Sequence, residues 1–453
     1  MRRLPFHVLA ALCLAACTSD PNGVGPATDT AATLDTSAAP IDSAEPEPDS
    51  AAATDVAEPE PDSAATTDVA EPEPDALASD SEVAADSAVA ADVDTVEPGP
   101  YGGPVFDETV LHTIAVDFDP SYTDTLDNDR SQRVPCTFTF DGVVLAEVGL
   151  REKGGYGSNS PIAEKPPFSL KFDTFIADQR LFGLKKLVLN NHQEDPTLLS
   201  ETLSYWLWRR AGMPAPLSSY AVVSVNGEPK GIYVVKEPIA DDFLERNFGK
   251  SNDGGNVYEG FYHPEDLSLG DFVLHPEETD LKDEVEDGRS RADINALAAA
   301  IDETPDDTWA VEVGARMDLD HYLRAFALTA ILGYWDSLDF YNNNYYLYHN
   351  PADGLFVTLP HGMDQVRFDG DVESWPMGRL AQRVRSIEAL DERYHAQVEE
   401  LLATVWDVAA IHARIDAIAA LLHSTTRDDW RTQGDLESLD DYMDSIKDAV
   451  ASH

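Results

Sequence analysis

The chain has 453 residues, of which 84 are acidic and 31 are lysine or arginine, and its formal net charge is −53. Residues 1–100 hold 21 acidic residues and two arginines, a net charge of −19, which leaves −34 of the total for residues 101–453. Such a surface repels phosphate backbones and anionic headgroups, so nucleic acid and anionic lipid are excluded as expected partners. Divalent cations or basic polypeptides fit it, although a role in solubility would need no partner.

Residues 1–16 have the features of a secretory signal peptide. Two arginines follow Met1, and the apolar run from Leu4 to Ala16 is shorter than the roughly 18 residues that indicate a membrane-spanning helix. The run ends in "LAAC", which resembles a bacterial lipobox in which Cys17 receives a diacylglycerol. An ordinary cleaved signal peptide is the alternative. We predict an exported lipoprotein of the cell envelope or cell surface that contacts the membrane only through its Cys17 lipid.

Residues 17–100 consist mainly of Ala, Asp, Glu, Pro, Ser and Thr, and "AEPEPD" recurs at Ala44, Ala57 and Ala70. Such a segment buries too little apolar surface to offset its chain entropy, and its prolines favour extended geometry. We predict a disordered acidic stalk. The alternative is an acidic peptide that binds cations or a cationic partner.

Residues 101–453 are the predicted folded domain. Short alternating segments and the turn at Asn226-Gly227 predict strands in its first half. Asp195-Pro196 predicts the start of a helix that ends at Gly212, and helical patterns dominate after residue 317. This order predicts an α+β fold with a sheet-rich N-terminal part and a helix-rich C-terminal part.

The segment from Asn342 to Gln365 predicts a β-hairpin whose polar residues gather at its open end. Two strand patterns, "YYLYHN" and "LFVTLP", are joined by the turn "NPADG". A hairpin brings its ends together, so we expect Asn344 beside Asp364, with Asp336 shortly upstream. Two carboxylates and an amide oxygen suit Mg²⁺ or Mn²⁺, and a nearby carboxylate can deprotonate a hydroxyl. In the alternative, these residues merely cap the hairpin and end the neighbouring elements.

Several long motifs occur in the order typical of the spore-coat protein H (CotH) family. They are "VGLREKGGYGS", "KPPFSLKFD", "LFGLKKLVLNNHQEDPTLLSETLSYWLWRRAGMPAP", "VNGEPKGIYVVKEPI", "FLERNFG" with "GGNVYEG", and "WDSLDFYNNNYYLYH" through "LPHGMDQ". The chain from Phe106 to Asp371 therefore resembles this family. The resemblance implies an atypical protein-kinase-like fold of two lobes, which binds ATP with a divalent metal and, in spore-coat members, phosphorylates coat proteins.

The resemblance also implies roles at the open end of the hairpin. Asp336 resembles the catalytic-loop aspartate of kinases, Asn344 the asparagine that follows it, and Asp364 the metal-binding aspartate. One departure concerns the metal, because many relatives read "PWDxD" where Gly362 replaces the first aspartate here. Loss of that carboxylate removes the metal site if the ion depends on it and changes nothing if Asp364 is the ligand.

Four further residues resemble the nucleotide-binding parts of the family. Lys171 resembles the strand lysine that contacts phosphates, and Glu201 the helix glutamate that pairs with it. Arg151 and Lys153 lie in the strand and turn that cover the nucleotide. Without the resemblance, each would be interpreted as an ordinary strand, helix or turn residue. A second departure is Glu259, which stands where relatives often have lysine.

We therefore predict a lipid-anchored extracytoplasmic kinase that transfers the γ-phosphoryl group of ATP to a protein hydroxyl, with Mg²⁺ or Mn²⁺ bound. Its partner would be a protein substrate or a surface partner of basic charge. The alternative is a non-catalytic module for adhesion or envelope assembly on the same fold, because ATP is scarce outside the cytoplasm and a stalk suits such a role.

Overall fold

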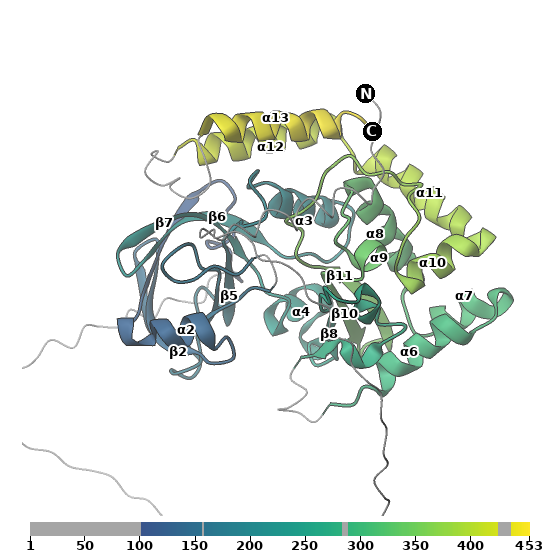
Figure 1. The fold of residues 1–453 in the computed structure, drawn as a ribbon, viewed down its shortest axis with the longest axis horizontal. Helices are drawn as coiled ribbons and strands as arrows, with labels where there is room; N and C mark the ends of the chain where they lie inside the picture. Colours follow the sequence, from purple (N-terminus) through teal and green to yellow (C-terminus); the bar gives the residue numbers. More distant parts are fainter. Residues whose placement is uncertain (1–100, 156–157, 283–288, 425–435) are drawn as a thin grey trace, which may run out of the picture. The chain divides into compact units, whose positions relative to one another are not determined.

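The computed structural model describes residues 101–155, 158–282, 289–424 and 436–453. The predicted signal peptide, Cys17 and the stalk lie outside the described residues. Strands dominate the N-terminal part and helices the C-terminal part (Figure 1). The α+β architecture expected from the order of patterns is therefore confirmed.

In the described residues, the N-terminal part is a closed barrel of seven strands. In sheet order these are β1 (Leu111–Asp117), β2 (Val134–Phe140), β3 (Val143–Glu152), β4 (Phe168–Lys171), β5 (Lys186–Asn190), β7 (Glu228–Lys236) and β6 (Ser218–Val225). Neighbours pair antiparallel, except that β1 and β6 pair in parallel and close the barrel. Every second residue of β2 is buried, as the two-residue period of a strand requires.

Strand β7 separates two hydrophobic cores, because successive side chains point to opposite faces of a sheet. Tyr233 and Val235 belong to the core inside the barrel. Ile232 and Val234 belong to the larger core that the barrel shares with the helices. Lys236, at the end of β7, follows the second set and is buried on the helical side.

Helix α3 (Ser200–Arg210) packs against β6 and against α8 (Leu319–Leu332). It begins later than the predicted start at Asp195. Leu198 has a left-handed backbone (φ 58°), which interrupts a helix, and the Asp195 carboxylate instead accepts hydrogen bonds from the backbone N–H groups of Thr197 (3.0 Å) and Ser200 (2.9 Å). Asp195 thus organises the loop before the helix.

A second sheet, with strand order β11–β10–β8–β9, carries the predicted hairpin. Its strands are β11 (Leu355–Pro360), β10 (Tyr345–Asn350), β8 (Val257–Glu259) and β9 (Asp280–Leu281). Tyr345 pairs with Pro360 and Asn350 with Leu355. The hairpin and its register are confirmed, so the residues before β10 and after β11 lie at one edge of the sheet.

Helix α8 is buried along almost its whole length and packs against α11. Several further helices complete the described part of the chain. They are α2 (Thr123–Asn128), α4 (Asp241–Phe248), α6 (Ala292–Glu303), α7 (Asp306–Gly314), α9 (Leu338–Tyr341), α10 (Arg379–Ser386), α11 (Glu388–Thr404), α12 (Val408–Leu422) and α13 (Leu436–Val450). Gly333 ends α8 in the left-handed conformation that glycine adopts without strain (φ 62°). Across the described residues, every helix is too short or too polar to cross a membrane.

Candidate active site

A buried ion pair joins the end of β7 to the first turn of α3. Lys236 Nζ contacts Glu201 Oε1, and the two side chains are 5% and 0% exposed. Glu201 also accepts hydrogen bonds from Asn190 Nδ2 (2.7 Å) and the Tyr205 hydroxyl (2.9 Å). Burial opposes the charge on Glu201, but Lys236 and the Asn190 amide outweigh it and lower the pKa of Glu201 to about 2. The pair is therefore charged at neutral pH and fixes α3 to the barrel.

The expected pairing of Lys171 with Glu201 is wrong, because Lys236 occupies that place. Lys171 ends β4 and lies opposite Lys186, at the start of β5. Glu201 is instead bonded to Asn190, at the other end of β5. The sequence showed a lysine on a half-buried strand, but the position of β7 beside β5 in the barrel decides which lysine reaches α3.

Lys153 and Asp364 bring further charges to this ion pair. Lys153 follows β3, and burial together with the charge of Lys236 lowers the pKa of Lys153 to about 8, while Glu201, Glu259 and Asp364 oppose this shift. Asp364 follows β11 after a short turn. The barrel and the hairpin thus place two lysines and several carboxylates in one site.

Asp364 has an excess of negative charge around it. Burial is the largest cause that raises the pKa of Asp364 well above its usual range, and the carboxylates of Glu201, Glu194 and Asp195 raise it further. Lys236 offsets only part of this effect. A half-buried carboxylate among other carboxylates is the environment that a bound cation relieves.

Asp336 is held by the asparagines in front of β10. Asn343 Nδ2 donates to Asp336 Oδ1 (3.0 Å), and Asn344 Nδ2 donates to Asp336 Oδ2 (2.6 Å). Burial, with a contribution from the charge of Glu194, raises the pKa of Asp336 to about 7, although both hydrogen bonds oppose the shift. Both oxygens of the Asp336 carboxylate are therefore oriented by asparagine amides, whereas the expected place of Asn344 beside Asp364 stays a prediction.

Gly362 lies in the turn after β11, against Asn344. Its backbone is left-handed (φ 55°), and a Cβ atom at this position would lie 2.5 Å from Asn344 Oδ1. The Tyr334 hydroxyl donates to the carbonyl oxygens of His361 and Gly362, both at 2.8 Å, and so fixes this turn. The glycine that replaces an aspartate of the relatives thus makes room for Asn344.

Glu259 is the second departure from the relatives, and the ammonium group of Lys282 balances its negative charge. Lys282 follows β9 and pairs with Glu259, which His361 Nε2 also contacts (3.3 Å). Burial opposes the charge on Glu259, but His361 and Lys282 lower its pKa well below the usual range. A lysine ammonium therefore stands beside Glu259.

Arg151 contacts the barrel and acts on the second sheet. Its Nη1 donates to the carbonyl oxygen of Arg130 (3.4 Å), and its charge acts on the buried Tyr346 of β10. The side chain thus lies where the barrel faces the second sheet.

Sequence reasoning missed two residues of this site, Lys236 and Glu194. Lys236 lies in the motif "GIYVVKEPI", and a charged residue that directly follows the apolar run "IYVV" was a signal that could have found it. Glu194 lies in the loop before α3, bonds the side chain of Gln365, and adds charge beside Asp336 and Asp364. In the sequence, nothing distinguishes Glu194 from any other loop residue.

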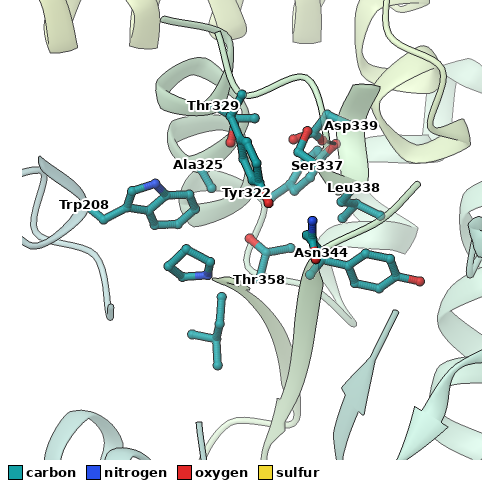
Figure 2. Close-up of a pocket in the computed structure, with 13 residues that line it drawn as sticks. Trp208, Tyr322, Ala325, Thr329, Ser337, Leu338, Asp339, Asn344 and Thr358 are labelled. Carbon is teal, nitrogen blue, oxygen red and sulfur yellow. Dashed lines mark hydrogen bonds between the residues drawn. The ribbon is translucent and has the colours of Figure 1, made fainter. Parts of the chain in front are cut away.

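A small cavity of about 30 Å³ lies beside Asn344, next to this site (Figure 2). Asp339 accepts a hydrogen bond from the Tyr322 hydroxyl (2.7 Å) at its wall, and burial raises the pKa of Asp339 to about 7. Thr358 Oγ1, also at the wall, is buried without a hydrogen-bond partner among the described residues. The cavity has room for about one or two water molecules, so it is too small for a nucleotide.

Among the described residues, no three His, Cys, Asp or Glu side chains are placed to hold a metal ion by themselves. Mg²⁺ needs no such cage, because it keeps several waters and is usually held by one or two carboxylates together with phosphates. Asp364, the Asn344 amide and the surrounding excess of negative charge fit an ion of that kind.

We expect Lys236→Met to lower the free energy of unfolding by about 3–5 kcal/mol, because it leaves Glu201 buried without its cation. The pKa of Glu201 is below its ordinary value, so the pair stabilises the fold above that ordinary value and loses this effect as the pH falls towards 2. Lys171→Met, on a half-buried strand residue, is the control, with an expected loss below about 1 kcal/mol. Urea unfolding of both variants measures the difference, and equal losses would contradict the assigned pairing.

Gly362→Ala should cost more stability than Gly354→Ala. Both glycines have a left-handed backbone, and alanine costs about 1–2 kcal/mol in that conformation. Only Gly362 would also push its Cβ atom against Asn344, whereas nothing lies within 4 Å of a Cβ atom on Gly354. Unfolding free energies of the two variants test this, and a Gly362→Ala loss no larger than that of Gly354→Ala would refute the close approach of Asn344.

Comparisons with known proteins identify the family of this chain. Inner spore coat protein H of Bacillus subtilis (strain 168) is 23% identical over 287 residues, which span 60% of this chain and 77% of that protein. Inner spore coat protein H-like protein of the same organism is 36% identical over 72 residues, 16% of this chain and 22% of that protein. Among solved structures, the proinflammatory kinase CtkA of Helicobacter pylori covers 63% of this chain and 93% of its own, with 12% identity and a TM-score of 0.28. A sequence model of the family described as CotH kinase protein matches residues 150–452, more than half of the chain, and the chain therefore belongs to that family.

Proposed function

We propose that this chain is a protein kinase that transfers the γ-phosphoryl group of ATP to a hydroxyl group of a protein, with Mg²⁺ or Mn²⁺ bound. The observation that carries the proposal is the convergence of the Lys236–Glu201 pair, Lys153, Asp336 and Asp364 in one site. Membership of a family described as kinases supports it. Phosphoryl transfer needs positioned cations and an oriented base rather than a nucleophile on the enzyme.

The two lysines would bind the phosphates of ATP. Lys153 and Lys236 lie close enough for the charge of one to lower the pKa of the other, which makes this region attractive to anions. Glu201 is a positioning residue, because it holds Lys236 by a direct ion pair and is itself held by Asn190. Without Glu201, the lysine would lose its fixed place in the site.

Asp336 would act as the base that accepts the proton of the acceptor hydroxyl. Asn343 and Asn344 hold its two oxygens, so the carboxylate is oriented before the acceptor arrives. The hydroxyl oxygen forms a bond to the γ-phosphorus while the bond from the γ-phosphorus to the bridging oxygen of ATP breaks, and ADP leaves. The hydroxyl proton passes to Asp336.

Asp364 and Asn344 are the residues that would hold the divalent ion. When bound, the ion would neutralise the charge that gathers on the phosphate oxygens during transfer. A cation would favour the ionised form of Asp364, since Lys236 balances only part of the negative charge around it.

Export, the Cys17 lipid and the stalk complete the proposal. They would place the domain outside the cytoplasm, attached to a membrane through the lipid, with a protein substrate or surface partner of basic charge.

The second candidate function is a non-catalytic adhesion or assembly module. Gly362 favours it, because Asn344 fills the space that an aspartate of the relatives would need at this position.

The test is incubation of the full-length chain with γ-labelled ATP, Mn²⁺ and a basic protein acceptor. We expect labelling of the acceptor and a loss of about 100-fold or more in Asp364→Asn, because the metal–phosphate complex loses its carboxylate. Asp307→Asn, on an exposed aspartate of α7, is the matched control and should label normally. Equal labelling by the Asp364 and Asp307 variants would sink the site assignment, and no labelling by the unaltered chain would favour the non-catalytic module.

A further inference from the structure

One face of the barrel sheet carries cations on three neighbouring strands. Arg151 of β3 pairs with Ser169 of β4, and Lys171 of β4 pairs with Lys186 of β5. Paired residues of antiparallel strands point to the same side of a sheet, and so do residues two apart on one strand. The alternate residues of these strands belong to the barrel core. Arg151, Lys171 and Lys186 therefore lie together on the outer face of the barrel.

Arg133 adds a fourth cation to this face. It directly precedes β2, and its guanidinium donates to the carbonyl oxygens of Gly149 (3.0 Å) and Ser169 (2.8 Å) and to the Ser169 hydroxyl (3.0 Å). Burial, and then the charge of Arg151, lowers the pKa of Arg133 to about 10. The two guanidinium groups thus lie close enough to repel each other. We call this surface the basic face, and its members are Arg133, Arg151, Lys171 and Lys186.

The basic face holds like charges that lack ion-pair partners among the described residues. Lys171 and Lys186 stand directly opposite each other, an arrangement that destabilises a pair of strands. The folded part carries −34 of the net charge, so four cations without paired carboxylates stand out from the rest of the domain. A surface with this electrostatic character attracts anions, and a bound anion would relieve the repulsion.

Two carboxylates lie near the basic face, but each contacts a cation outside it. Asp173 contacts Arg180 (3.0 Å), and Asp241 contacts Lys185 (3.1 Å). Each also acts at longer range on one member of the basic face and offsets part of its charge. Neither carboxylate occupies the basic face, so it stays open to an anionic ligand.

The chain enters the described domain beside the basic face. Tyr101 is the first described residue, and its hydroxyl donates to Glu237 Oε1 (2.9 Å), directly after β7. The Gly102 backbone N–H donates to the carbonyl oxygen of Phe182 (3.0 Å), shortly before Lys186 begins β5. Since β5 pairs with β7, residue 100 joins the domain at the end of the barrel where Lys186 lies.

The residues that precede Tyr101 have the charge that the basic face lacks. Residues 91–100 read "ADVDTVEPGP" and contain Asp92, Asp94 and Glu97 but no lysine or arginine. An extended segment of this length spans up to about 33 Å, which is enough to cross the three strands. A tethered segment also has an effective concentration in about the millimolar range, so weak contacts keep it bound.

We propose that the acidic end of the stalk, with Asp92, Asp94 and Glu97, docks in extended form on the basic face of its own chain. The docked segment neutralises the like charges of this face and fixes the direction in which the domain leaves its stalk. The docking goes beyond the proposed kinase function and does not depend on it.

The test follows acetylation of lysines in the full-length chain by a limiting amount of acetic anhydride, measured by mass spectrometry. We expect Asp92→Asn/Asp94→Asn/Glu97→Gln to raise the rates at Lys171 and Lys186 about 3-fold or more, because a docked carboxylate shields each ammonium group. In about 1 M salt, where the screening length is about 3 Å, the difference between this variant and the unaltered chain should disappear.

The matched control is Asp55→Asn/Glu58→Gln/Glu60→Gln, which removes the same number of charges from another part of the stalk. It should leave the rates at both lysines of the basic face unchanged. Lys250, whose side chain is 84% exposed, reports general reactivity and should react alike in every variant. All these substitutions lie outside the folded domain, so they leave its core intact.

Each other outcome decides against the docking. Equal rates at Lys171 and Lys186 in the unaltered chain and the variant of residues 92, 94 and 97 would overturn it. Shielding that grows with protein concentration would assign the basic face to the stalk of a second copy of the chain. Shielding by added inorganic triphosphate, without any effect of the stalk variant, would assign the face to an external phosphate compound and also overturn the proposal.

Discussion

The ion pair between Lys236 and Glu201 is the interaction on which the rest of the site depends. Both charges are removed from water, so neither is stable without the other. The pair ties β7 to α3, and the loop that enters α3 carries Glu194 and Asp195 to the neighbourhood of Asp364. Helix α3 also packs on α8, which ends shortly before Asp336. One buried contact therefore sets the distance between the cations of the barrel and the carboxylates of the helical part.

The charges of the site are arranged in two groups rather than mixed evenly. In one group, the charge of Lys236 lowers the pKa of Lys153, and in the other, the charge of Glu194 raises the pKa of both Asp336 and Asp364. Each group alone is strained by like charges in a poorly solvated place. A metal–nucleotide complex would relieve both groups at once, since it would offer a cation to the carboxylates and phosphates to the lysines. This complementarity is the physical basis of the kinase proposal.

Local patterns predicted the parts of the site that depend on neighbours in sequence. The hairpin between Asn344 and Asp364 followed from two alternating strands and a turn, and its pairing agrees with that prediction. The partner of Glu201 depends instead on the order of strands in the barrel, where β7 inserts between β5 and β6. No periodicity encodes that order, so Lys171 was chosen over Lys236. Glu194 was missed for a related reason, because its effect on Asp336 and Asp364 depends on how the loop before α3 packs and not on any local pattern.

The measurement that tests this account most directly is the unfolding temperature of the full-length chain with ATP, with Mn²⁺, and with both together. Ligands that bind only the folded state raise this temperature. The account predicts a rise of at least about 2 °C with ATP and Mn²⁺ together, well above the sum of their separate effects. No rise with any combination of nucleotide and divalent metal would contradict it.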